Sequence, residues 1–150
     1  MLAEEYVSVK ASSVALTGNG RLWTTVVGES ENQGRSVILS WTDDLEIWER
    51  DTLASEDFIE AVLWTDPSDC LWMFCSTSDG NIKTRRCADP GASDPMWENG
   101  ADVGRGPWKC TSAPVVTDGA WVLPVAFQKG VCTVSSMDGG ASWTVGKSFI

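Results

Sequence analysis

The chain contains no histidine. Without imidazole it cannot build a Ser-His-Asp or Cys-His catalytic arrangement, and it lacks the commonest ligand of transition metals. Any acid–base chemistry would fall to Asp, Glu, Lys, Tyr or Cys side chains. The sequence therefore predicts no metal site and no cofactor.

Long apolar runs and basic side chains are also scarce. The apolar runs span only a few residues, whereas a membrane-crossing helix needs about 20. Eleven Lys and Arg against 21 Asp and Glu give a formal net charge of −10. An acidic protein repels phosphate backbones, so we expect neither nucleic acid nor membrane as a partner. The first residues lack the pattern of a secretory signal, which makes the cytoplasm the default compartment and leaves export open.

The cysteines are few and show no metal-binding spacing. There are five, an odd number, and none forms a Cys-x-x-Cys pair. We expect them to be reduced and mostly buried as small apolar residues. For an exported protein, pairing between neighbouring strands is the alternative.

Tryptophan, by contrast, is abundant. The chain has nine, and 43% of its 150 residues are hydrophobic, which is enough for one domain with a real core. Trp23, Trp72 and Trp121 are spaced 49 residues apart. Each follows a cluster of turn residues and begins an apolar run. This spacing indicates an internal repeat.

A second series couples an aspartate to a later tryptophan. Asp89 and Asp138 are again 49 residues apart, and Asp-Pro-Gly-Ala-Ser in one copy corresponds to Asp-Gly-Gly-Ala-Ser in the other. The first copy lacks the glycines. The three pairs are Asp43 with Trp48, Asp89 with Trp97, and Asp138 with Trp143. Two landmarks with one period predict three repeated units.

Each unit predicts four short antiparallel strands, because β-branched and aromatic runs alternate with turn residues. No window keeps an apolar period of 3.6 residues, so we expect almost no helix. Pro114 and Pro124 weaken the strand prediction locally. A repeated four-stranded unit predicts an all-β fold, a β-propeller, with a β-sandwich of about twelve strands as the alternative. The single domain, 1–150, would hold blades at about 11–53, 57–103 and 108–150.

Residues 136–143 read Ser-Met-Asp-Gly-Gly-Ala-Ser-Trp, which matches the Asp-box pattern Ser-x-Asp-x-Gly-x-x-Trp. With blade-like repeats around it, the sequence resembles the sialidase (neuraminidase) superfamily and its Asp-box propellers. In that family the box lies on the turn between the third and fourth strands of a blade, away from the substrate face. The resemblance implies a structural role for Ser136, Asp138, Gly140, Trp143, Asp89, Gly91, Trp97, Asp43 and Trp48.

A physical argument supports this role for Asp138. Its carboxylate can accept hydrogen bonds from backbone N–H groups of its own turn. Gly139 and Gly140 permit positive φ angles. Trp143 would pack between blades.

The resemblance implies a catalytic set that the sequence matches poorly. Sialidase chemistry needs an arginine triad, a Tyr/Glu nucleophile pair and an Asp acid/base, but the only tyrosine is Tyr6 and no arginine can be assigned by motif. We therefore expect a non-catalytic module that binds a glycan or a protein. The alternative is a glycoside hydrolase of sialidase type whose active site is assembled by a homodimer. Its weak catalytic candidates are Glu60 and Asp57.

Three blades cannot close a ring. Each terminal blade would expose an apolar face, and two arcs related by a twofold axis would complete the six blades that the resemblance implies. We expect a homodimer. A longer chain, or a partner polypeptide that supplies the other half, are the alternatives.

The loop Gly-Arg-Gly-Pro-Trp-Lys-Cys is the most site-like segment. It places Arg105, Trp108 and Lys109 together, and these could bind the carboxylate and ring of a sugar. Arg35, in a loop expected on the same face, completes the candidate ligand-binding set. The alternative is that Trp108 packs between blades and Arg105 is a solvated charge.

Overall fold

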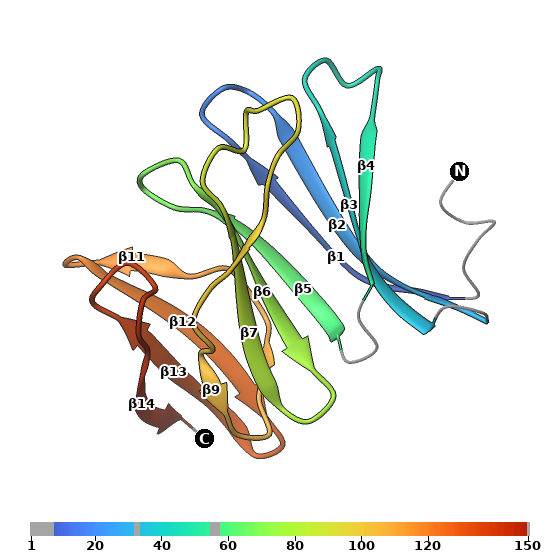
Figure 1. The fold of residues 1–150 in the computed structure, drawn as a ribbon. Helices are drawn as coiled ribbons and strands as arrows, with labels where there is room; N and C mark the ends of the chain where they lie inside the picture. The colour runs from blue at the N-terminus through green and yellow to red at the C-terminus, as the bar shows by residue number, and fades with distance from the viewer. Residues whose placement is uncertain (1–7, 32–33, 55–57, 150) are drawn as a thin grey trace.

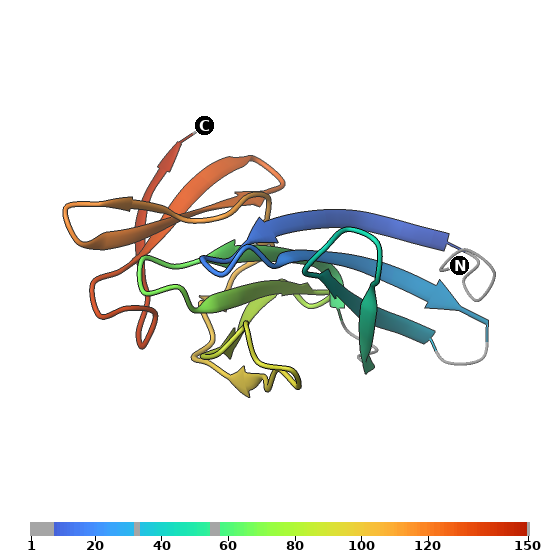
Figure 2. The ribbon, with the colours of Figure 1, turned by 90° about the horizontal axis from the view of Figure 1, so that it is seen from above.

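The computed structural model describes residues 8–31, 34–54 and 58–149, which form three antiparallel sheets in succession along the chain (Figure 1). No helix occurs in these described ranges, and so none that could cross a membrane. The second sheet lies between the other two (Figure 1), and Figure 2 shows the first and third sheets at opposite ends of the molecule. The predicted all-β class is confirmed.

Strand order follows chain order within each sheet. The first sheet is β1 (Ser8–Leu16), β2 (Leu22–Ser30), β3 (Gly34–Thr42) and β4 (Glu49–Ala54). The second is β5 (Phe58–Thr65), β6 (Leu71–Thr77), β7 (Asn81–Cys87) and β8 (Glu98–Asn99), with β9 (Gly104–Arg105) also paired to β7. The third is β10 (Lys109–Cys110) and β11 (Val115–Thr117), both paired to β12 (Ala120–Phe127), then β13 (Gly130–Ser136) and β14 (Thr144–Phe149).

Two of the sheets have an edge strand that consists of two short pieces. The first strand of the third sheet is interrupted between β10 and β11, where Pro114 has no N–H to give to a ladder. The fourth strand of the second sheet consists of β8 and β9, yet Val103 N between them still donates to Ile82 O (2.8 Å). Pro124, in contrast, lies within β12 opposite Thr133. Both interruptions fall on strands at a sheet edge, where lost ladder bonds are tolerated best.

The core consists of two layers, one on each side of the second sheet. Every residue of β6 is buried, and its side chains alternate between the layers. Leu71 and Met73 belong to the layer against the first sheet, whereas Trp72 and Phe74 belong to the layer against the third. Because both faces of the second sheet are covered, β6 is apolar almost throughout.

The first strands of neighbouring sheets lie beside one another. Leu63 N in β5 donates to Ser13 Oγ in β1 (2.9 Å), and Thr65 Oγ1 donates to Leu16 O (2.9 Å). Further hydrogen bonds between sheets join Gly18 N to Asp69 Oδ1 (2.6 Å) and Cys110 N to Ser76 Oγ (2.8 Å). The three sheets thus fan out from β1, β5 and β10.

The three evenly spaced tryptophans do not occupy equivalent positions. Trp23 points from the first sheet toward the second, and Trp72 points from the second toward the third. Trp121 instead points back toward the second sheet, where its ring lies 5.3 Å from that of Trp72. The interpretation of all three as one repeated landmark is therefore wrong for Trp121.

Strand register accounts for this reversal. Thr42, the last residue of β3, pairs with Leu22, whereas Ser136, the last residue of β13, pairs with Trp121. Trp121 therefore stands in the register of Leu22, one residue away from that of Trp23. Since side chains alternate between faces along a strand, a slip of one residue turns a side chain to the other face.

All five cysteines are free and buried, in agreement with the prediction. Burial raises the pKa of Cys75 and of Cys110 to about 12, so both thiols stay protonated and unreactive at neutral pH. They act as small apolar residues of the two layers.

Candidate functional site

The turn between β13 and β14 is organised around Asp138. Its Oδ1 accepts hydrogen bonds from Ser136 Oγ (2.8 Å) and Ser142 N (2.8 Å), and its Oδ2 accepts one from Ser142 Oγ (2.5 Å). Gly140 N donates in turn to Ser136 Oγ (2.8 Å). The hydroxyl and N–H of Ser142 lower the pKa of Asp138 to about 2. A carboxylate held in this way braces its turn and is a poor general acid near neutral pH.

In the first sheet this role belongs to Asp44 and not to Asp43, for which the sequence predicted it. Asp44 Oδ1 accepts hydrogen bonds from Thr42 Oγ1 (3.1 Å) and from Glu46 N and Ile47 N (both 2.9 Å). The cause is strand register, because Thr42 ends β3 as Ser136 ends β13, and the bracing aspartate stands two residues further on. The next residue has a positive φ in both turns, 65° at Leu45 and 68° at Gly139.

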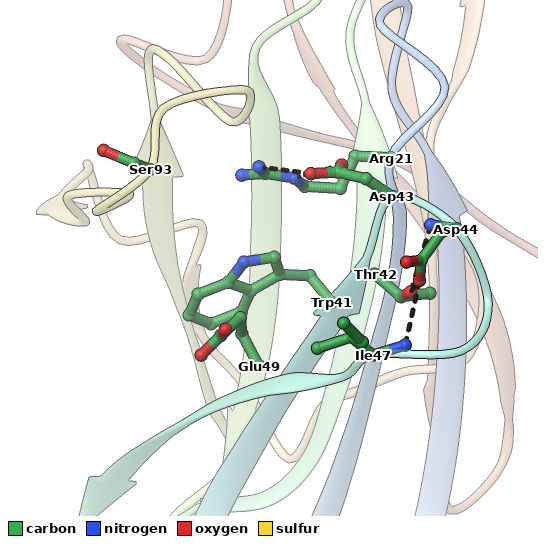
Figure 3. Close-up of a pocket in the computed structure, with 8 residues that line it drawn as sticks. All are labelled: Arg21, Trp41, Thr42, Asp43, Asp44, Ile47, Glu49 and Ser93. Atoms are coloured by element: carbon green, nitrogen blue, oxygen red, sulfur yellow. Dashed lines mark hydrogen bonds and ion pairs between the residues drawn. The ribbon is translucent and has the colours of Figure 1, made fainter.

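Asp43 instead forms an ion pair with Arg21 (Figure 3). Arg21 Nε lies 2.8 Å from Asp43 Oδ1, and Nη2 lies 2.9 Å from Oδ2. The guanidinium also donates from Nη1 to the carbonyl oxygens of Pro90 (2.9 Å) and Ala92 (2.6 Å). The hydrogen bonds between the two side chains raise the pKa of Arg21 and lower that of Asp43. Arg21 therefore ties the first sheet to the turn that follows Asp89.

The glycine two residues after the aspartate has a role in contacts between sheets. A Cβ on Gly140 would lie 2.7 Å from Trp72 Cη2 and 2.9 Å from Trp121 Cζ3. A Cβ on Gly91, at the same place after Asp89, would lie 2.7 Å from Asn19 Nδ2 of the first sheet. In the first sheet this place holds the exposed Glu46. Glycine thus occurs where the preceding sheet presses on the turn.

The tryptophans after these turns follow the same rule. Trp97 meets Trp23 of the preceding sheet edge-on at 6.0 Å, and Trp143 meets Phe74 of the preceding sheet edge-on at 5.8 Å. Trp48 is 45% exposed. All three are in the same register, each directly before the residue that pairs with the third strand: Glu49, Glu98 and Thr144.

The candidate ligand loop lies at the opposite end of the sheets from the aspartate turns. Trp108 is half-buried against the core layer between the second and third sheets, and its backbone N–H donates to Gly106 O (2.7 Å). A Cβ on Gly106 would lie 2.4 Å from Trp108 Nε1, so the indole folds back over its own loop. This geometry favours the packing role for Trp108. Arg105 lies in β9 opposite Asn81.

The other candidates are divided among the three sheets. Lys109 is exposed beside a cavity of about 250 Å³ that Phe127 and Gln128 also line. Glu60 lies in β5, near enough to Cys110 for its charge to add to the raised pKa of that thiol. Arg35 is half-buried in β3 opposite Glu29, on the first sheet. Asp57 lies outside the described residues. The described part of the chain holds no group of three potential metal ligands.

A cleft that the sequence did not reveal lies at the end of the aspartate turns, between the first and second sheets (Figure 3). Its volume is about 350 Å³, and its base is the half-buried Trp41. The Trp41 ring stacks on that of Trp23 with centroids 4.9 Å apart and an interplanar angle of 29°. The lining residues are Arg21, Trp41, Thr42, Asp43, Asp44, Ile47, Glu49 and Ser93.

Comparison with solved structures identifies the architecture. The Hadza microbial sialidase Hz136 superposes on 94% of this chain with a TM-score of 0.66 and 13% sequence identity. The chain has a sialidase-like fold. It spans about a third (34%) of the length of Hz136. No protein-family model and no curated protein matches the sequence.

Within this sialidase-like fold, the described residues line open regions at both ends of the sheets. The Lys109 cavity lies at one end and the Trp41 cleft at the other. A further cavity of about 370 Å³ lies between the second and third sheets beside the turn around Asp138, where Trp72, Trp121 and Gly140 line it. The glycine-proline loop in the sequence pointed to the Lys109 region. The Trp41 cleft could not be predicted, because Ser93 reaches it from another sheet and no local sequence pattern around Trp41 indicates it.

Proposed function

We propose that the chain is a non-catalytic binding module of sialidase-like type, and that two copies close a six-bladed Asp-box propeller. The observation that carries the proposal is the exposed Trp48. Its counterparts Trp97 and Trp143 are each packed on the preceding sheet. Trp48 belongs to the first sheet, so no preceding sheet among the described residues can cover it.

The outer face of the first blade has the composition of a packing surface. Val14 and Leu16 in β1 are 62% and 63% exposed. They lie on the same face of the sheet as Trp48, since Leu16 pairs with Leu22 and Leu22 with Thr42, at the level of Trp48. Apolar area of this kind is usually buried against a partner. A neighbouring blade would bury it as the second blade buries the opposite face.

The outer face of the third blade supplies the complementary surface. In β12, Val122, Pro124 and Ala126 alternate with residues buried toward the second blade. The exposed Val115 and Val131 pair with this strand on the same face. These side chains are small, as the bulky Trp48 and Leu16 of a second copy require.

Hairpin length also supports this pairing. At the two junctions inside the chain, the preceding sheet presses on a glycine, whereas the first blade presents Glu46 there. The preceding blade at a closing junction would be the partner's third blade, whose Asp118-Gly119 hairpin is the short one. A shorter hairpin there would leave more room for Glu46 than the hairpin that places Asn19 against Gly91. A twofold axis makes both closing junctions identical and leaves no open face.

Ring closure would complete the region around Lys109. The cavity beside Lys109 and Phe127 lies at the open end of the arc, so the first blade of the second copy, with Arg35, would become its neighbour. We propose this region as the place where a carbohydrate or protein ligand binds. Lack of catalysis is supported by Tyr6, the only tyrosine, which precedes β1.

The mass in solution tests ring closure. Light scattering should give twice the chain mass of 16.2 kDa for the native protein. Trp48→Glu and Val131→Glu, on the two closing faces, should each give monomer. Met96→Glu is the control, because Met96 is also an exposed apolar residue, at 71% against 45% for Trp48 and 43% for Val131, but lies on neither face. A monomer for the native chain at micromolar concentration would overturn the homodimer.

Ligand binding and catalysis are tested separately. We expect the native protein to bind on a glycan array and to leave a fluorogenic sialoside intact, with binding weakened by Lys109→Ala. Hydrolysis that disappears in Glu60→Gln would favour the alternative, a glycoside hydrolase of sialidase type assembled by the homodimer. If the protein shows neither glycan binding nor hydrolysis, the proposal retains only a protein ligand. Crosslinking at Lys109 would search for it.

A further inference from the structure

The Trp41 cleft has a rigid aromatic base. One face of the Trp41 ring is covered by Trp23, which is itself fully buried and held edge-on by Trp97. The Trp41 side chain also lines the cleft, beside Glu49 (Figure 3). An indole fixed in this way needs no reordering to receive a flat apolar surface, so little conformational entropy opposes binding.

The walls of the cleft accept hydrogen bonds and carry negative charge. Glu49 pairs with Trp41 across β3 and β4, so the two side chains lie on the same face of the sheet. Ser93 lines the cleft from the second sheet. Asp44 lines it from the turn between β3 and β4, where its Oδ1 is already engaged by Thr42, Glu46 and Ile47. These groups suit a ligand rich in hydroxyl donors.

The cleft is unsuited to an anion. Arg21 is its only cationic lining residue, and four of the five guanidinium donors are already engaged, two by Asp43 and one each by Pro90 O and Ala92 O. The carboxylates of Asp44 and Glu49 would repel a carboxylate or phosphate. Sialic acid and sugar phosphates are therefore disfavoured here.

We propose that this cleft is a binding subsite for a neutral sugar unit. The apolar C–H face of the sugar ring stacks on Trp41, and its hydroxyls donate to Glu49 and to Ser93. The volume of about 350 Å³ is within the range of small-molecule sites, roughly 300–1,000 Å³. The cleft lies within one chain and at the opposite end of the sheets from Lys109. This inference therefore does not rest on ring closure or on a ligand bound beside Lys109.

Calorimetry and tryptophan fluorescence test the proposal with a defined panel: galactose, N-acetylglucosamine, cellobiose and maltose as neutral probes, and N-acetylneuraminic acid as the anionic one. At least one neutral sugar should bind, and N-acetylneuraminic acid should not compete for this cleft. Trp41→Ala should weaken binding about tenfold or more, whereas Trp41→Phe should retain most of it. Glu49→Ala should also weaken it, while the matched control Glu46→Ala, outside the cleft, should not.

Three outcomes would overturn the inference. The first is that no neutral probe binds at millimolar concentration. The second is that binding survives both Trp41→Ala and Glu49→Ala. The third is that the cleft binds tetramethylammonium and no sugar, which would make it a site for a cation on an aromatic ring. Circular dichroism checks the fold of each variant. If Trp41→Ala does not fold, the comparison of Glu49→Ala with Glu46→Ala decides. Val131→Glu tests ring closure on a distant sheet, so the two proposals can fail independently.

Discussion

The first and third sheets carry the same structural unit in two different surroundings. In both, the third strand ends in a turn braced by an aspartate, and a tryptophan follows just before the fourth strand pairs. Trp143 is packed against Phe74, whereas Trp48 is exposed. The unit itself therefore does not determine burial; the sheet that precedes it does.

The glycines show the same dependence. Gly140 is confined by Trp72, but its counterpart in the first sheet is Glu46, which faces solvent. The glycine occurs where the preceding sheet presses on the turn, at Gly91 and Gly140. Where no preceding sheet in the described part of the chain does so, the turn has its bracing aspartate without glycines.

The largest expected effect separates the two tryptophans. Trp143→Ala should lower the free energy of unfolding by about 3 kcal/mol, because it removes an indole from the second core layer. Trp48→Ala should have little effect on the monomer. Urea unfolding at low protein concentration, where a dimer would dissociate, measures both. Equal losses would contradict the contrast between the sheets.

A smaller effect is expected within one turn. Gly140→Ala combines a positive φ of 88° with a Cβ less than 3 Å from Trp72, and should destabilise the protein by about 2 kcal/mol. Gly139→Ala meets a positive φ of 68° but open space, so its cost should be lower. Thermal unfolding of the two variants compares strain alone with strain plus a clash. A larger loss at Gly139 would refute the packing role of Gly140.

The two neighbouring aspartates of the first sheet provide a third test. Asp44→Ala removes the acceptor of two backbone N–H groups, and Asp43→Ala removes the partner of Arg21. We expect hydrogen exchange at the amides of Glu46 and Ile47 to accelerate in Asp44→Ala only. Faster exchange at these amides in Asp43→Ala alone would restore Asp43 as the bracing residue.

The smallest effect is a pH dependence. The pKa of Asp138 is about 2 in the folded protein, below its ordinary value of 3.8. Its contribution to stability is therefore complete above about pH 4 and is lost as pH falls toward 2. Asp138→Asn should be less stable than the native protein at neutral pH, and the two melting temperatures should converge in acid. A constant difference would exclude the ionised brace.

The parts of the fold that are local in sequence could be predicted. The strands could, because apolar and turn residues alternate, and so could the turn around Asp138, where the motif is complete. Asp43 was preferred to Asp44 because two aspartates are adjacent and the glycines are absent. Only the pairing of Thr42 with Leu22 fixes the register there.

The rest depended on contacts between distant segments. Trp121 faces backward because it pairs with the end of β13 one residue out of register with Trp23, which equal spacing along the chain conceals. The Trp41 cleft requires Ser93 from another sheet, and the position of Trp108 depends on how its loop folds back. None of these is encoded in a short sequence pattern.

The alternation of side chains along β6 has a consequence for how the molecule unfolds. Leu71 and Met73 anchor one core layer while Trp72 and Phe74 anchor the other, so neither layer can be lost without displacing the same strand. Damage to either layer therefore spreads to the other through one backbone. The three sheets should melt in a single cooperative transition, with no stable two-sheet intermediate.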